Sequence, residues 1–175
     1  GNAGRVSASG RRARPGVVLT SSELRAPYKR EGGQPEGMES ISLARTIGAP
    51  PEAVRDLVED VEPFICAADF DAVAVDGDRL TIENGFAIAR IELDLELVDD
   101  PEAVLAYQQV DGIFEEMYTC YELTETEAGT KVTARTDFAL DVSAVGGFLD
   151  GTVIRRQRKR ELRNQFDYLE AETDD

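Results

Sequence analysis

Two tyrosines and one glutamate are the residues of this sequence best suited to acid-base or polar binding chemistry. Tyr107 precedes an Asp-Gly pair, whereas Glu115 and Tyr121 follow it at an even spacing. Residues two apart in a strand share a face, so Glu115 and Tyr121 are expected on the same side. A carboxyl group in apolar surroundings has a raised pKa and suits general acid or base catalysis. A register shift at Gly112 would instead place Glu115 in solvent.

The same alternation predicts a face that contacts an apolar ligand. Met117 and Thr119 lie between Glu115 and Tyr121, and methionine adapts to irregular shapes. The alternatives are ordinary core packing for Met117 and Leu123, and tyrosine hydroxyls satisfied by the backbone. The predicted ligand contacts come from three strands and the last helix, namely Tyr107, Glu115, Met117, Thr119, Tyr121, Phe138, Phe148, Thr152, Arg155 and Lys159.

A basic run near the carboxyl end, Arg155-Arg156-Gln157-Arg158-Lys159-Arg160, stands out in an acidic chain. Helical spacing places Arg155 and Lys159 on the stripe that continues to Leu162, Phe166 and Leu169, and places Arg156, Arg160 and Arg163 on its flank. Arg155 or Lys159 would then pair with an anionic group of a ligand, or with Glu115. The alternative is a solvated ridge, with an i, i+4 contact between Gln157 and Glu161.

Cys66 and Cys120 are the two cysteines, and the sequence contains no histidine. This composition excludes disulfide frameworks, structural zinc, Ser-His-Asp or Cys-His nucleophiles and imidazole-ligated iron. We expect both thiols to be buried and inert, with a reactive thiol as the alternative. No metal and no cofactor is predicted.

These residues are positioned by a strand that feeds a helix at the start of the domain and by a following meander. Alternation in 41–47 changes to helical spacing after Pro50 and Pro51, and this helix is expected to end near Pro63. Asp76-Gly77-Asp78 predicts a hairpin between strands at 72–75 and 79–83. Further strands are expected at 87–97, 104–110, 113–124 and 130–140. After Gly146-Gly147, a long helix is predicted to run to about Glu170.

Charge divides the chain into two parts. Residues 1–37 carry seven basic and three acidic residues, whereas residues 38–175 carry twelve basic and thirty-two acidic residues. The net charge over all 175 residues is -16. We expect a disordered basic extension at 1–37, upstream of a possible true start at Met38, one domain at 38–172 and an acidic tail at 173–175. A field this negative argues against DNA or RNA as a partner.

The acidic surface and the low lysine content, with only three lysines, are typical of proteins from halophilic archaea. At high salt, screening removes most of the self-repulsion of such a surface. The alternative is an acidic protein from an ordinary cytoplasm. No apolar run in the sequence approaches the ~18 residues of a membrane span, so a cytoplasmic location is expected.

Several motifs together resemble the START-like superfamily of helix-grip proteins, SRPBCC, in its polyketide cyclase/dehydrase and lipid-transport branch. They are Ile47-Gly-Ala-Pro-Pro-Glu-Ala-Val54, Gly112-Ile-Phe with Tyr121-Glu-Leu123, Gly129-Thr-Lys-Val132 and the terminal helix. The resemblance implies an α+β helix-grip fold, in which a curved antiparallel sheet of about six to seven strands wraps around a long C-terminal helix. It also implies a hydrophobic cavity for lipids, quinones or polyketides. Coenzyme Q-binding and ribosome-association relatives continue toward a Trp-Cys pair, whereas here Ile65-Cys66-Ala67-Ala68 follows and tryptophan is absent.

Three functions stay open from the sequence. The first is binding or carriage of a small hydrophobic ligand between the sheet and the last helix, because no catalytic constellation is visible. The second is a cyclase or dehydrase that uses Glu115 with Tyr107 or Tyr121 as general acid and base. The third is association with a ribosome or a protein through the ridge at 155–160.

Overall fold

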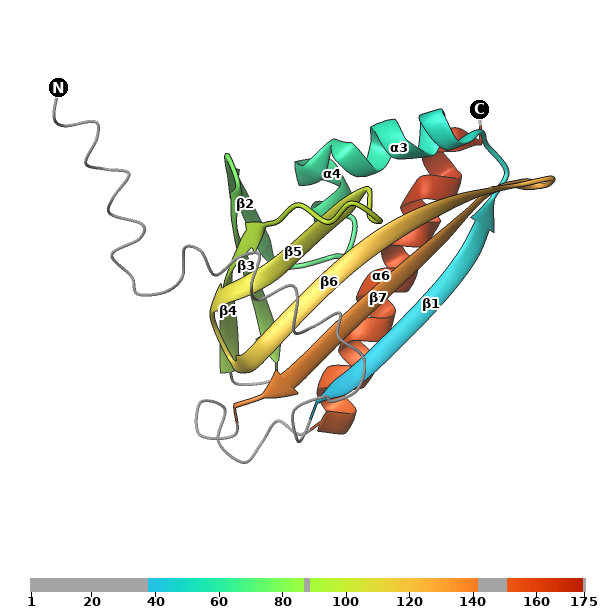
Figure 1. The fold of residues 1–175 in the computed structure, drawn as a ribbon. Coiled ribbons are helices and arrows are strands. Elements are labelled where there is room, and N and C mark those ends of the chain that lie inside the picture. Colours follow the sequence, from blue (N-terminus) through green and yellow to red (C-terminus); the bar gives the residue numbers. More distant parts are fainter. Residues whose placement is uncertain (1–37, 87–88, 142–150, 175) are drawn as a thin grey trace, which may run out of the picture. The chain divides into compact units, whose positions relative to one another are not determined.

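The computed structural model describes residues 38–86, 89–141 and 151–174. Seven strands form one antiparallel sheet in the order β1-β7-β6-β5-β4-β3-β2 (Figure 1). In chain order, the elements are β1 (Glu39–Ile47), α3 (Pro51–Glu59), α4 (Val61–Cys66), β2 (Ala72–Asp76), β3 (Arg79–Phe86), β4 (Ala89–Leu97), β5 (Leu105–Asp111), β6 (Phe114–Thr126), β7 (Gly129–Leu140) and α6 (Gly151–Thr173).

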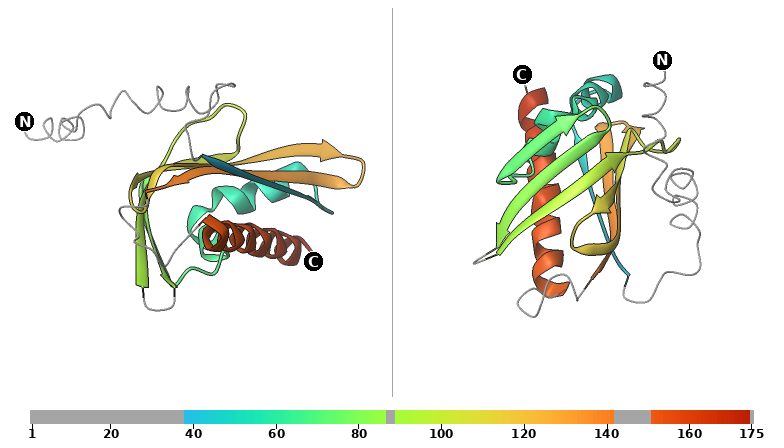
Figure 2. Two further views of the ribbon diagram at one scale, coloured as in Figure 1. Left: turned by 90° about the horizontal axis from the view of Figure 1, so that it is seen from below. Right: turned by 90° about the vertical axis from the view of Figure 1, so that its left-hand side faces the viewer.

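The sheet curves around α6, as the sequence predicts. Figure 2 shows β2, β3 and β4 turned away from the plane of β1, β6 and β7, with α6, α3 and α4 on the inner side of the bend. A sheet with one apolar face buries that face by curling over a helix. The expected fold class, a curved antiparallel sheet wrapped on a long C-terminal helix, is confirmed.

The strand-to-helix junction also forms where the sequence predicts it. Pro51 occupies the first turn of α3, where its missing N–H is not needed, and Val54 and Val58 are buried on the inner face. The predicted end near Pro63 is wrong, because α3 ends at Glu59 and a second short helix, α4, begins at Val61. Pro63 lies in the first turn of α4, which accepts proline as readily as α3 does.

Two turns depend on glycine. Asp76 pairs with Arg79 across the β2–β3 turn, and Gly77 has φ +64°, which confirms the predicted Asp-Gly hairpin. At the start of β7, Gly129 has φ +135°, and a Cβ there would lie 2.1 Å from the Ile47 carbonyl oxygen. The β6–β7 turn therefore packs directly against the end of β1.

A β-bulge near the start of β6 decides which residues face inward. The pairing with β7 shifts between Phe114 and Glu116, so Glu115 is the extra residue. The Gln109 side chain holds this region, because its Nε2 donates to the Phe114 carbonyl at 2.7 Å and its Oε1 accepts from the Phe114 N–H at 3.1 Å. After the bulge, the odd-numbered residues from Met117 onward point toward α6.

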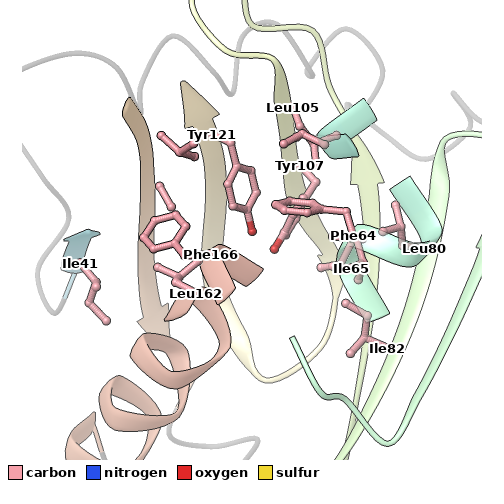
Figure 3. Close-up of a cluster of buried hydrophobic side chains, with 14 of the residues drawn as sticks. Ile41, Phe64, Ile65, Leu80, Ile82, Leu105, Tyr107, Tyr121, Leu162 and Phe166 are labelled. Atoms are coloured by element: carbon pink, nitrogen blue, oxygen red, sulfur yellow. The ribbon is translucent and has the colours of Figure 1, made fainter. Parts of the chain in front are cut away.

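The core lies between the sheet and the helices. Ile154, Leu162, Phe166 and Leu169 are the buried apolar residues of α6. Figure 3 shows Leu162 and Phe166 facing the sheet, across from Phe64 of α4. Burying one side chain of this size contributes about 1.5–3 kcal/mol, so these contacts fix α6 on the inner face of the sheet.

Candidate ligand-binding site

A small cavity lies between the inner face of the sheet and the first half of α6. Its volume is only about 30 Å³. Most of the wall is apolar, and the polar part comes from two strands, β3 and β5, and one stretch of α6. The lining residues are Phe70, Ile82, Asn84, Ile91, Leu93, Leu95, Tyr107, Ile113, Phe114, Met117, Ile154, Gln157, Arg158 and Glu161.

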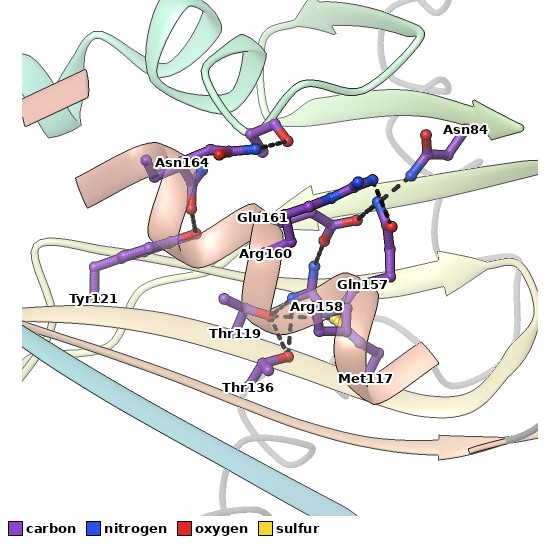
Figure 4. Close-up of polar contacts among 12 residues, drawn as sticks. Asn84, Met117, Thr119, Tyr121, Thr136, Gln157, Arg158, Arg160, Glu161 and Asn164 are labelled. Carbon is purple, nitrogen blue, oxygen red and sulfur yellow. Dashed lines mark hydrogen bonds and ion pairs between the residues drawn. The ribbon is translucent and has the colours of Figure 1, made fainter. Parts of the chain in front are cut away.

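The polar wall is organised around Arg158 of α6 (Figure 4). Its guanidinium forms a short charge-assisted hydrogen bond to Glu161, three residues further along the helix. Its Nη2 also donates to Thr119 of β6 and to Thr136 of β7, both at 3.0 Å. Arg158 is only 7% exposed and Glu161 only 4%. A charged pair this deeply buried needs several partners, and two strands of the sheet supply them to Arg158.

Glu161 has amide partners in addition to Arg158. Its Oε2 accepts from Gln157 Nε2 at 3.1 Å and from Asn84 Nδ2 at 3.4 Å. Burial raises the pKa of Glu161, and the nearby Arg158 and Gln157 oppose that rise. The pKa of Arg158 is raised despite its own burial, because Glu161 stabilises the charged guanidinium. The cavity wall therefore holds a pair of nearly compensating charges.

Two tyrosines extend this polar region toward α4. The Tyr121 hydroxyl donates to Gln165 Oε1 at 2.6 Å, and Gln165 Nε2 donates to the Phe64 carbonyl at 3.2 Å. Figure 3 shows the tips of Tyr107 and Tyr121 between the sheet and the helices. Tyr107 lines the cavity and interacts electrostatically with both Tyr121 and Arg158. Burial raises the pKa of Tyr121 well above its usual value, so this hydroxyl is a neutral donor at physiological pH.

Solved structures share the fold of this chain, although neither the protein-family models nor the curated proteins give a match. A Thermus thermophilus protein aligns with a TM-score of 0.60 and 20% identity, over 76% of this chain and 95% of its own. The Zhui aromatase/cyclase from a Streptomyces species aligns with a TM-score of 0.58 and 18% identity, over 76% of this chain and 94% of its own. A START superfamily protein from Mycobacterium smegmatis aligns with a TM-score of 0.56 and 13% identity, over 78% of this chain and 97% of its own.

The chain has the START-like helix-grip fold. Identities this low show a common fold and leave the activity open. These neighbours come from bacteria, and they lend no support to an origin in a halophilic archaeon.

Four of the predicted contact residues lie at or beside the cavity of this helix-grip fold. Tyr107 and Met117 line it, Thr119 accepts a hydrogen bond from Arg158, and Tyr121 is buried next to Tyr107. Phe138 is buried one layer away, where its ring packs edge-on against Phe114 at 5.5 Å.

Other predicted contacts lie elsewhere. Glu115 is exposed on the bulge and Thr152 is exposed on α6, so neither lines the cavity. Of the two placements that the sequence leaves open for Glu115, the pocket one is wrong and the solvent-exposed one is correct, because one inserted residue turns the side chain outward. Phe148 lies outside the described residues.

The predicted pairing of Arg155 or Lys159 with Glu115 or with the cavity is also corrected. Arg155 binds Glu39 of β1 at 2.7 Å, with 41% and 38% of the two side chains exposed. Lys159 is half-buried and does not line the cavity. On this fold, the inward stripe of α6 runs through Ile154, Arg158, Glu161 and Leu162. In the first half of α6 this face lies one position before the predicted Arg155 and Lys159, whereas the predicted Leu162, Phe166 and Leu169 are buried.

The basic run is thus divided between the interior and the surface. Arg158 is buried, whereas Arg156 and Arg160 are exposed. Arg160 donates to Gln157 at 2.9 Å, and the expected contact between Gln157 and Glu161 is present. Arg158, in the middle of the basic run, therefore belongs to the cavity wall and not to an exposed basic ridge.

The two thiols differ in exposure. Cys120 is buried, but Cys66 is exposed at the end of α4, so the expectation that both are buried is wrong for Cys66. Partial desolvation and the nearby Glu62 carboxylate raise the pKa of the Cys66 thiol. A thiol with a raised pKa is a poor nucleophile at neutral pH.

Sequence reasoning missed Arg158, Glu161 and Asn84 as cavity residues. The signal for the first two was present, because Ile154, Arg158, Glu161, Leu162 and Gln165 have the spacing of one helical face. Polar residues at such positions indicate a buried network. Asn84 has no comparable signal. Within the described parts of the chain, no helix is both long and apolar enough to cross a membrane.

Proposed function

We propose that the protein binds a small, largely apolar molecule in the cavity between the sheet and α6. The observation that carries the proposal is the cavity wall, in which aliphatic and aromatic side chains from β3, β4, β5 and β6 meet one polar cluster on α6. Mostly apolar walls with a few placed polar groups are typical of small-molecule sites. Lipids, quinones and polyketide-like molecules are the ligand classes we propose for it.

The cavity is narrow and must widen to accept such a ligand. Its 30 Å³ is far below the roughly 300–1,000 Å³ of ordinary ligand pockets. Phe70, Asn84, Leu93 and Gln157 are half-buried, whereas the other lining residues are buried. We place the entrance at these four residues, where moving side chains breaks the fewest core contacts.

Binding is a better proposal than catalysis for the residues in view. An enzyme of the cyclase or dehydrase type was expected to use Glu115 with a tyrosine, and Glu115 is exposed while Tyr107 and Tyr121 are buried. Glu161 is engaged by Arg158 and two amides rather than standing ready to transfer a proton. Association through the ridge at 155–160 is weakened because Arg158 faces inward.

The test places a larger side chain at the proposed entrance of the cavity. Leu93→Trp adds volume at a half-buried lining residue, and Val110→Trp is the control because Val110 is 40% exposed on β5 and does not line the cavity. Binding of the neutral fluorescent probe N-phenyl-1-naphthylamine is measured by titration. We expect Leu93→Trp to weaken binding by about tenfold or more, equivalent to about 1.4 kcal/mol, and Val110→Trp to leave it unchanged. Equal binding by both variants and the unmodified protein would contradict the proposal.

A further inference from the structure

One of the three guanidinium nitrogens of Arg158 forms no hydrogen bond within the described part of the chain. Its Nη1 donates to Glu161 and its Nη2 donates to Thr119 and Thr136. The Nε is buried and has no hydrogen-bond partner among the residues that the structure describes. A buried N–H without an acceptor destabilises the folded protein, so an acceptor that reaches it is favoured.

The position of Arg158 makes a ligand the natural source of that acceptor. Arg158 lines the cavity, and its three bonded partners hold the guanidinium in one orientation. Opening of the cavity, which any ligand larger than water requires, brings ligand atoms to this wall. Tyr107 lines the same wall and interacts with the Arg158 guanidinium, so its hydroxyl adds a further polar group to this wall.

Charge balance indicates which kind of acceptor fits. Glu161 already compensates the guanidinium, and it is almost completely buried. A carboxylate or phosphate on the ligand would add an uncompensated negative charge beside Glu161 in a low-dielectric site. A neutral carbonyl oxygen accepts hydrogen bonds without that cost.

We infer that the cavity recognises ligands with a neutral carbonyl oxygen, of the ketone or quinone kind, which accepts a hydrogen bond from Arg158 Nε. This inference rests on the proposed function and narrows it to a ligand class. The apolar wall contributes affinity, and Arg158 selects for the carbonyl and sets its orientation.

The first experiment uses the unmodified protein and three matched probes. These are 1-tetralone, tetralin, which lacks the carbonyl, and 1,2,3,4-tetrahydro-1-naphthoate, which carries a charge. We expect 1-tetralone to bind about tenfold more tightly than tetralin, because its carbonyl accepts a hydrogen bond from a charged group. We also expect it to bind more tightly than the carboxylate. In nitrogen-15 NMR spectra, 1-tetralone should shift the Arg158 Nε–H resonance and tetralin should not.

The second experiment compares Arg158→Lys with Arg155→Lys on the same helix. Lysine keeps the charge but removes the Nε donor. In Arg158→Lys, the dissociation constants of tetralin and 1-tetralone should therefore be nearly equal. Arg155 pairs with Glu39 at the surface, so Arg155→Lys should keep the preference. The spectral test needs no variant and stands even if Arg158→Lys folds poorly.

The outcomes separate this inference from the proposed function. Equal binding of 1-tetralone and tetralin, or tighter binding of the carboxylate, overturns the role of Arg158 and leaves apolar binding intact. Binding of none of the three probes, together with no binding of N-phenyl-1-naphthylamine, overturns both.

Discussion

At the scale of single residues, the buried pair of Arg158 and Glu161 governs the polar side of the cavity. Removal of one member leaves the other charge without its main partner, whereas removal of both leaves an apolar wall. The two residues should therefore be strongly coupled in their effect on stability.

We expect Arg158→Met and Glu161→Met each to lower the free energy of unfolding by about 3–5 kcal/mol. The double variant should be more stable than either single variant. Urea unfolding monitored by circular dichroism measures all three. The control is the half-exposed surface pair, Arg155→Met with Glu39→Met, whose coupling should stay within about 1 kcal/mol. Additive losses at Arg158 and Glu161 would show that they do not act as a pair.

The same pair predicts a pH dependence. Burial raises the pKa of Glu161, so the folded state binds more protons than the unfolded state between the unfolded value of about 4.3 and the raised folded value. The free energy of unfolding therefore falls as pH increases through that window. Arg158 opposes the rise, so Arg158→Met should raise the pKa of Glu161 further and extend the fall to higher pH.

Urea unfolding at a series of pH values tests this sign. The matched control is Arg158→Met with Glu161→Gln, which has no titrating carboxyl at this position and should lack the extra slope. A slope that is the same in Arg158→Met and in this double variant would be incompatible with a raised pKa for Glu161.

At the scale of elements, the contact between the β6–β7 turn and the end of β1 depends on one glycine. Gly129 has a positive φ, and a Cβ there would lie 2.1 Å from the Ile47 carbonyl oxygen. Gly129→Ala should lower the free energy of unfolding by about 2 kcal/mol or more. The neighbouring Gly48 has open space around it, so Gly48→Ala is the control and should have little effect. Thermal unfolding of the two variants decides the matter, and equal midpoints would contradict this close packing.

The elements also show how far sequence patterns reach. Strand alternation and the Asp-Gly hairpin are local signals, so the inner face of β6 from Met117 onward and the turn at Gly77 are predicted correctly. The bulge before Met117 shifts the pairing by one residue, and the sequence pattern left both the pocket and the solvent placement of Glu115 open.

On α6, the error has a different cause. Its inward face carries Arg158, Glu161 and Gln165, so a search for a stripe of apolar residues cannot find its true centre. All three contact the strands or α4 through hydrogen bonds. Sequence patterns predicted where the cavity lies but not which charged groups it contains.

At the scale of the whole molecule, net charge is the main unexplained feature. With 35 acidic and 19 basic residues, self-repulsion opposes folding at low ionic strength. If the halophilic interpretation is correct, KCl should raise the thermal midpoint steadily from 0.1 M to 2 M, because screening shortens the Debye length to about 3 Å at 1 M. A gain of 1 kcal/mol corresponds to about 2–4 °C for a chain of this size. A midpoint that does not change with KCl would contradict that interpretation.

The cavity between the sheet and α6 should take up an apolar ligand, and isoleucine methyl NMR can detect the ligand there. Ile82, Ile91, Ile113 and Ile154 line the cavity, whereas Ile41 and Ile47 are buried away from it. Titration with N-phenyl-1-naphthylamine should shift the δ1 methyl signals of the lining group and leave those of the other two in place. Shifts confined to Ile41 and Ile47, or no methyl shift at a saturating concentration of the probe, would contradict the claim.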